Sequence, residues 1–175
     1  MHLADLLVAM AIFGVVSAAV FTVLQQGLRV YAVGASRAES QQSARVAVER
    51  LAGEIRTAGR GPRAAAFAAI SVAEPTHIVL HHDLDGDGVI AGNGETITWR
   101  LTGKTLRRDA GGGAQPIIDG VRSFELGYLD AAGGSTQVPD EIRTVVITVV
   151  TEASWDVDER APVTVFSTRV RLRNR

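Results

Sequence analysis

The feature that most restricts the possible folds is a long apolar segment at the N-terminus. From Leu3 to Leu24 the only ionisable side chain is Asp5. As an α-helix this segment would be about 33 Å long, enough to cross the hydrocarbon core of a bilayer. A secretory signal peptide is one alternative, but such peptides begin with basic residues and have a shorter apolar run. A buried core helix is another, although few are so long and apolar on every side. The sequence therefore predicts a transmembrane helix over residues 1–24.

The helical pattern continues into residues 25–58, which contain no proline. Apolar and small side chains recur there mostly three or four positions apart, and charged or amide side chains fill the positions between them. Gly59, Gly61 and Pro62 follow, and they favour the end of a helix. We expect residues 25–58 to form an amphipathic helix half. Its stripe, which should pack on a head, consists of Leu24, Leu28, Tyr31, Ala35, Ala44, Val48, Leu51, Ile55 and Ala58.

Beyond Pro62 the pattern changes to short runs rich in β-branched and aromatic residues, separated by turn-forming stretches. Such runs predict strands at 69–73, 77–82, 96–101, 105–108, 121–129, 142–151 and 163–172. Strands that follow one long helix, rather than alternate with helices, are typical of an antiparallel sheet. The sequence therefore predicts an α+β fold, with a β-rich head over residues 59–175 and the helix covering one face of its sheet.

The first fourteen residues closely resemble the mature N-terminus of type IV pilins and type II secretion pseudopilins. The resemblance lies in Leu3, the acid at Asp5, the apolar run over 6–12 and Gly14. It covers the apolar segment, and it implies the type IV pilin fold, a long helix packed on an antiparallel head. The chain departs from the usual pattern at four positions: Met1 replaces phenylalanine, His2 replaces threonine, Asp5 replaces glutamate, and Thr22 stands where many pilins have proline.

The resemblance implies cleavage of a leader by prepilin peptidase, N-methylation of Met1, residence in the inner membrane and then assembly into a filament. Since no leader precedes Met1, this residue is either the processed N-terminus or an initiator. In the family, the acid at position 5 neutralises the α-amino group of a neighbouring subunit. A carboxylate inside a bilayer is costly, so Asp5 should have a function, with the Met1 amine as its partner. The alternative is that Asp5 reaches the lipid headgroups. Gly14 should permit close helix packing.

A second motif begins at Asp83 and has aspartates at alternate positions followed by a glycine. Calcium loops have this pattern, because several oxygens must converge on a hard cation and glycine allows the sharp turn. The second half departs from the EF-hand pattern, and no helices flank it. We expect calcium as a candidate ligand, and a solvated turn between strands is the alternative. The candidate ligands are Asp83, Asp85, Asp87, Val89, Asn93 and Glu95.

The head is similar to that of PilW-type minor pilins and J-type secretion pseudopilins. The similarity lies in the acidic loop, the runs over 95–101 and 106–108, and the closing run over 169–174. Three histidines, His77, His81 and His82, offer a further metal set. Because adjacent strand residues point to opposite faces, we expect ordinary strand histidines instead.

Composition excludes several other functions. There is no cysteine, which removes disulfides, thiolate metal sites and covalently attached haem. No glycine-rich phosphate loop or nucleophile elbow is present, so neither a nucleotide cofactor nor catalytic residues are expected, and the protein should not be an enzyme. A net charge of -1 and few aromatic residues give no indication of nucleic-acid binding. The expected function is a structural subunit of a type IV pilus-like filament at the cell surface. The alternative is a minor tip pilin, or a periplasmic pseudopilin, whose head binds a surface, DNA or a secreted substrate.

Overall fold

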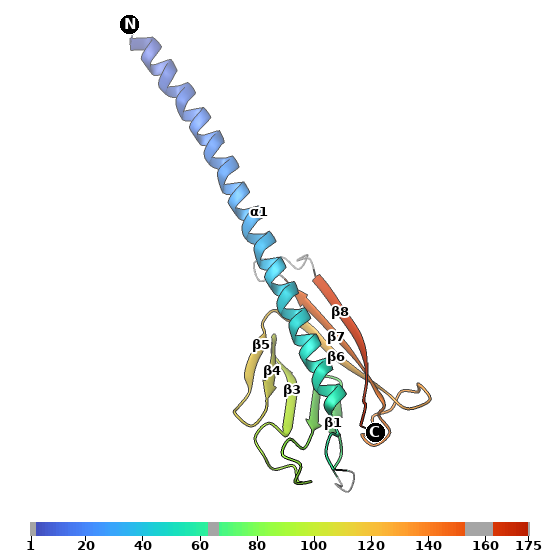
Figure 1. Ribbon diagram of the computed structural model, residues 1–175. Helices are drawn as coiled ribbons and strands as arrows, with labels where there is room; N and C mark the ends of the chain where they lie inside the picture. The colour runs from blue at the N-terminus through green and yellow to red at the C-terminus, as the bar shows by residue number, and fades with distance from the viewer. Residues whose placement is uncertain (1–2, 63–66, 153–162, 175) are drawn as a thin grey trace.

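The computed structural model describes residues 3–62, 67–152 and 163–174. A single helix, α1 (Leu3–Thr57), occupies the N-terminal third of the chain and extends far beyond the head (Figure 1). Its 55 residues correspond to about 80 Å of α-helix. The helix ends just before Gly59, which has a φ of 75° and donates its N–H to the carbonyl of His81 at 2.8 Å. The Asn174 side chain donates to the carbonyls of Thr57 and Ala58, so the C-terminal segment satisfies the open end of the helix.

The head contains two antiparallel sheets, whereas the sequence predicted one. The first has five strands in the order β1 to β5, and the second has three in the order β6-β7-β8. The strands are β1 (Ile70–Glu74), β2 (His77–His81), β3 (Thr96–Thr102), β4 (Thr105–Asp109), β5 (Gln115–Ile118), β6 (Val121–Leu129), β7 (Thr144–Glu152) and β8 (Val163–Arg171). The α+β class and the antiparallel pairing are confirmed.

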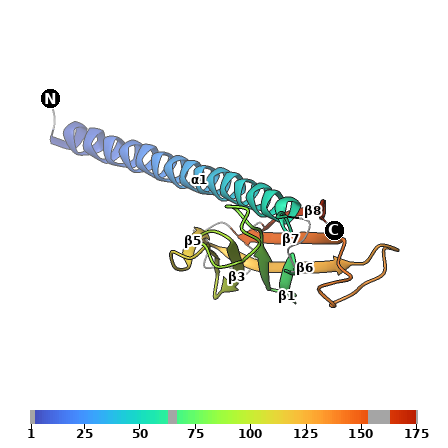
Figure 2. The same ribbon diagram turned by 60° about the horizontal axis from the view of Figure 1, so that its bottom comes forward.

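The helix packs on the head through its C-terminal part. Its buried face consists of Ala44, Ala47, Val48, Leu51, Ala52 and Ile55. This face contacts β5, β7 and β8, and Figure 2 shows α1 lying along one side of the sheets. Of the predicted stripe, the part from Ala44 to Ala58 is buried, but Leu28 is 62% and Tyr31 77% exposed. The packed part of α1 is therefore shorter than expected.

Alternation of side chains along the strands supplies the rest of the core. In β7, every second residue is buried, and those residues face the helix together with Phe124 and Leu126 of β6. Trp99, Ile78 and Leu80 provide the core of the five-stranded sheet. The two sheets are joined where Leu126 donates its N–H to the Pro75 carbonyl at 2.7 Å. One continuous core therefore lies under the helix.

A polar contact also fixes the helix to the five-stranded sheet. The carboxylate of Glu54 accepts hydrogen bonds from Trp99 Nε1 at 2.5 Å and from Arg108 Nε at 2.8 Å. Arg50, one turn earlier in α1, lies 3.4 Å from the same carboxylate. Trp99 is fully buried, and the Glu54 and Arg108 side chains are only 15% and 17% exposed. The pairing therefore satisfies a buried indole donor and sets the position of α1 over β3 and β4.

Candidate functional site

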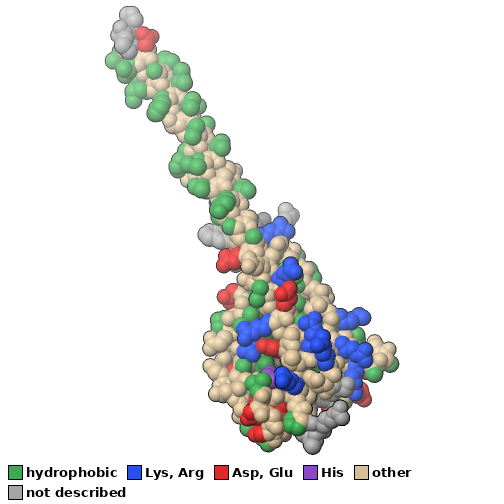
Figure 3. Space-filling model, viewed as in Figure 1, with side chains coloured by type: hydrophobic (Ala, Val, Ile, Leu, Met, Phe, Trp, Pro, Cys, Tyr) green, Lys and Arg blue, Asp and Glu red, His purple; other side chains and the backbone are tan. Residues whose placement is uncertain are grey.

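The first candidate site is the exposed shaft of α1, residues 3–35, which the head does not cover. Within the described residues, α1 is the one helix long and apolar enough to cross a membrane, and its apolar window has no buried residue. Figure 3 shows apolar side chains around the visible part of this shaft. An exposed N-terminal helix of this kind indicates membrane insertion or a signal sequence.

The predicted assembly residues lie at the start of this shaft. Asp5 is in the first turn of α1, where the partial positive charge of the helix N-terminus favours a carboxylate. Gly14 is open, since a Cβ there would meet no atom within 4 Å beyond the neighbouring backbone of its own helix. A neighbouring helix could approach closely at this position. Met1, the predicted partner of Asp5 and site of methylation, lies outside the described residues, as does His2.

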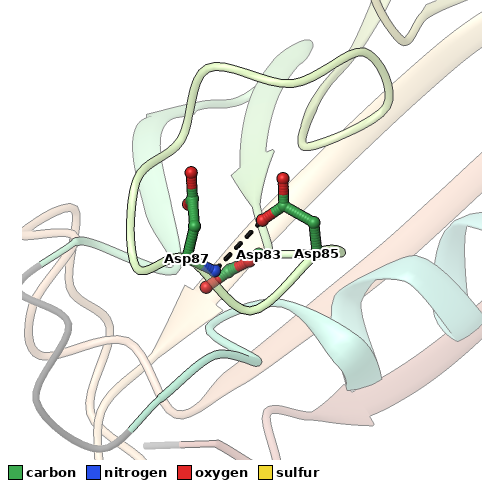
Figure 4. A group of neighbouring side chains, drawn as sticks. All are labelled: Asp83, Asp85 and Asp87. Carbon is green, nitrogen blue, oxygen red and sulfur yellow. Dashed lines mark hydrogen bonds between the residues drawn. The ribbon is translucent and has the colours of Figure 1, made fainter.

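The second candidate site is the loop between β2 and β3. Asp83, Asp85 and Asp87 each place a carboxylate oxygen within 4.8 Å of the others (Figure 4). Asp83 is buried at the base of the loop, and Asp85 and Asp87 are exposed. The loop thus brings together three of the six predicted ligands.

The Asp83 carboxylate organises the turn. It accepts the N–H of Gly86 at 2.6 Å and of Gly88 at 2.8 Å, and both glycines have positive φ. Burial acts to raise the pKa of Asp83, but these N–H bonds outweigh it and the pKa falls below its ordinary value. Asp85 shows the opposite outcome. An N–H bond from Asp87 lowers its pKa, but burial and the carboxylates of Asp87 and Glu95 together raise it.

Of the other three predicted ligands, Glu95 is not part of the carboxylate cluster, and the roles of Asn93 and Val89 stay predictions. Glu95 is buried, and its carboxylate accepts the N–H groups of Leu84, Ala91 and Gly92 at 3.0, 3.0 and 2.6 Å. These bonds lower its pKa. The Asn93 side-chain oxygen lies next to Gly111, in the loop after β4. Val89 donates its N–H to Asp87. Glu95 therefore links the beginning of the loop, at Leu84, to its end, at Ala91 and Gly92.

The donor chemistry of the loop fits a hard cation. Three carboxylates in one small volume repel each other, and a cation between them would relieve that repulsion. Oxygen ligands are those that calcium and magnesium prefer. The cluster could therefore bind a metal ion.

The three histidines do not form a metal site among the described residues. His77 lies 3.4 Å from Glu74, and the ring of His81 lies between Ser71 and Thr96. His82 is buried, and its Nδ1 has no hydrogen-bond partner within the described part of the chain. The adjacent His81 and His82 have separate surroundings, as expected for neighbours in an extended chain.

No protein-family model matches this chain, and no curated protein matches it. The long apolar helix packed on antiparallel sheets is consistent with a pilin-like architecture.

Sequence reasoning missed two structural features of the head. One is the contact of Glu54 with Trp99 and Arg108, which joins residues about fifty positions apart. The available signal was the position of Glu54, an acid in the amphipathic helix half that directly precedes the stripe residue Ile55. The other is the edge of β8 that pairs with no strand in the part of the chain that the structure describes, a feature that depends on strand order and has no local sequence signal.

Proposed function

We propose that this protein is a structural subunit of a type IV pilus-like filament, assembled through the N-terminal half of α1. The observation that carries the proposal is the extent of the exposed helix. Residues 3–35 of α1 are all exposed, and Ser36 is the first that is half-buried, so about 50 Å of helix extends beyond the packed part. A bilayer needs only about 30 Å of apolar helix.

The surplus helix supports an assembly rather than a simple anchor. Beyond the apolar segment, Leu28, Val30 and Tyr31 are 62%, 70% and 77% exposed. Large apolar side chains in consecutive turns favour burial, and here neither the head nor the hydrocarbon core would cover them. The corresponding segments of neighbouring subunits would cover them in a helical bundle.

Asp5 gives the bundle its register in this proposal. Its carboxylate neutralises the α-amino group of Met1 in an adjacent subunit, because both charges would be costly inside an apolar core. The subunit is held in the inner membrane before assembly, after processing by prepilin peptidase, and becomes part of an extracellular filament. It has no catalytic role.

The test separates insertion from assembly. Asp5→Ala should leave the amount of protein in the membrane fraction unchanged and abolish its recovery in sheared filaments, and Asp5→Glu should retain assembly. Glu39→Ala is the matched control, because it removes an exposed acid from the same helix outside the apolar segment. Wild-type filament recovery from Asp5→Ala would contradict the proposal.

The alternative place for the same subunit is the tip of a pilus or of a periplasmic pseudopilus, where the head would bind a surface, DNA or a secreted substrate. Immunogold labelling of the head distinguishes the two. Labelling along the whole filament identifies a shaft subunit, and labelling of the ends alone identifies a tip subunit.

We also propose that the loop from Asp83 to Asp87 binds calcium. The support is the convergence of three carboxylates on a turn whose glycines allow positive φ. Calcium should raise the melting temperature of the full chain in detergent, and a chelator should reverse the change. Asp85→Asn/Asp87→Asn should lose this response, while Glu125→Gln, an exposed acid on β6, should keep it. Titration calorimetry that shows no calcium uptake by the wild type would dispose of this site.

A further inference from the structure

Within residues 3–62, 67–152 and 163–174, the two sheets have four outer strands, and β8 is the one whose outer edge nothing there interrupts or covers. At β1 the pairing is interrupted by a bulge between Ile70 and Val72, and β5 is short and contains Pro116. At β6, the N–H of Leu126 donates to the carbonyl of Pro75, which lies in the turn between β1 and β2. Bulges, prolines and covering contacts of this kind prevent further strand pairing at sheet edges.

Strand β8 has a different character. It pairs with β7 through nine consecutive residues without a register shift. Among the described residues, nothing pairs with its other edge. Its first six residues, Val163–Thr168, contain no charge and no proline, and they are rich in β-branched side chains. Such a strand presents a regular row of unpaired backbone donors and acceptors to a further strand.

The two faces of β8 show which side chains a further strand would need. Thr164, Phe166 and Thr168 are on the face toward α1, because Gln41 of the helix bonds to Thr164 at 3.1 Å. A groove of about 250 Å³ lies there between the helix and the strand. Its lining is mixed: Val48, Ala52 and Phe166 are apolar, and Arg45, Glu49, Arg56, Ser167 and Thr168 are polar or charged. An added strand would place small or medium apolar side chains against the apolar part of this groove.

The opposite face of β8 is basic at its C-terminal end. Arg169 and Arg171 are exposed there, opposite Val146 and Thr144 of β7. Neither forms an ion pair within the described part of the chain. The segment 163–174 contains three arginines and no acid.

From these features we propose that β8 binds an extended acidic segment of a partner polypeptide, which adds to the sheet as a fourth strand. Its inward side chains are apolar and fill the groove under α1, and its outward side chains are acidic and pair across the strands with Arg169 and Arg171. This binding mode does not depend on assembly through the N-terminal helix.

The test uses the full chain in detergent micelles and a labelled synthetic peptide that alternates valine with glutamate. Binding is measured by fluorescence anisotropy, with empty micelles as the blank. Two further peptides serve as controls. One replaces glutamate by lysine, and the other carries a central proline, which keeps the charge but prevents strand pairing. The wild type should bind the glutamate peptide and neither control.

Charge reversal at the strand supplies the decisive comparison. Arg169→Glu/Arg171→Glu should bind the glutamate peptide about tenfold more weakly and should gain binding of the lysine peptide. Arg122→Glu is the control, because it reverses one arginine on β6, at the far edge of the same sheet. Hydrogen exchange should show new protection of β8 amides on binding. Absence of glutamate-peptide binding, equal binding of the proline peptide, or protection confined to other strands would each overturn the proposal.

Discussion

The contact between Glu54 and the five-stranded sheet gives a prediction with a calculable size. Glu54→Ala removes the acceptor of the buried Trp99 indole N–H and the partner of the largely buried Arg108 guanidinium. A buried donor left without a partner costs about 1–3 kcal/mol, and a hydrogen bond to a charged group contributes about 1.5–3 kcal/mol. Because partial exposure and relaxation reduce both terms, the free energy of unfolding should fall by about 3 kcal/mol.

The assay is urea unfolding of the full chain in detergent, followed by near-ultraviolet circular dichroism, which reports on packing of the head. Glu49→Ala is the control, since it makes the same change on the same helix but removes only an exposed contact with Arg45. It should cost less than about 0.5 kcal/mol. In a Trp99→Phe background the cost of Glu54→Ala should shrink, because the indole donor is then absent. Equal costs for Glu54→Ala and Glu49→Ala would refute the assigned role of Glu54.

Two further predictions concern packing and pH. Leu51→Ala should lower the free energy of unfolding of the head by about 3 kcal/mol, because Leu51 is buried between the helix and the sheets. Leu28→Ala should leave the free energy of unfolding unchanged in the same urea assay, because Leu28 is exposed. A large loss for Leu28→Ala would show that the head covers more of α1. Acidification should destabilise the head as pH falls below 6.5, the ordinary pKa of histidine, because burial lowers the pKa values of His81 and His82 and the unfolded chain therefore binds protons more readily. His81→Gln/His82→Gln should reduce this slope in unfolding curves measured between about pH 7 and pH 5, and an unchanged slope would count against these histidines.

The helix and most strands could be predicted because their signals are local. An apolar run without proline gives a helix, and alternating β-branched residues give strands, whatever the rest of the chain does. The end of the helix near Gly59 was also predictable, since a glycine with positive φ is a local requirement.

The missed features depend on long-range pairing. Strand β5 was not predicted because it has four residues and contains Pro116. So short a segment shows no alternation of apolar and polar residues from which a strand could be predicted. The division into two sheets follows from the break at Asp119 and Gly120, where the five-stranded sheet ends and β6 begins. A run of strand signals does not specify which neighbours pair.

The acidic loop shows the same limit at a candidate site. The spacing of Asp83, Asp85 and Asp87 predicted their convergence, since residues two apart in a turn can direct their oxygens to one point. The same spacing did not reveal that Glu95 would fold back to accept three N–H groups of the loop. Glu95 provides the hydrogen-bond acceptor for these backbone N–H groups, and they need such an acceptor only because the folded loop removes them from water.

Electron cryomicroscopy of filaments sheared from cells that produce the protein tests the central claim most directly. The account predicts that residues 3–24 of neighbouring subunits form the filament core, with the Asp5 carboxylate within about 4 Å of an adjacent α-amino group. Filaments that lack the protein, or a core in which these helices do not touch, would contradict it.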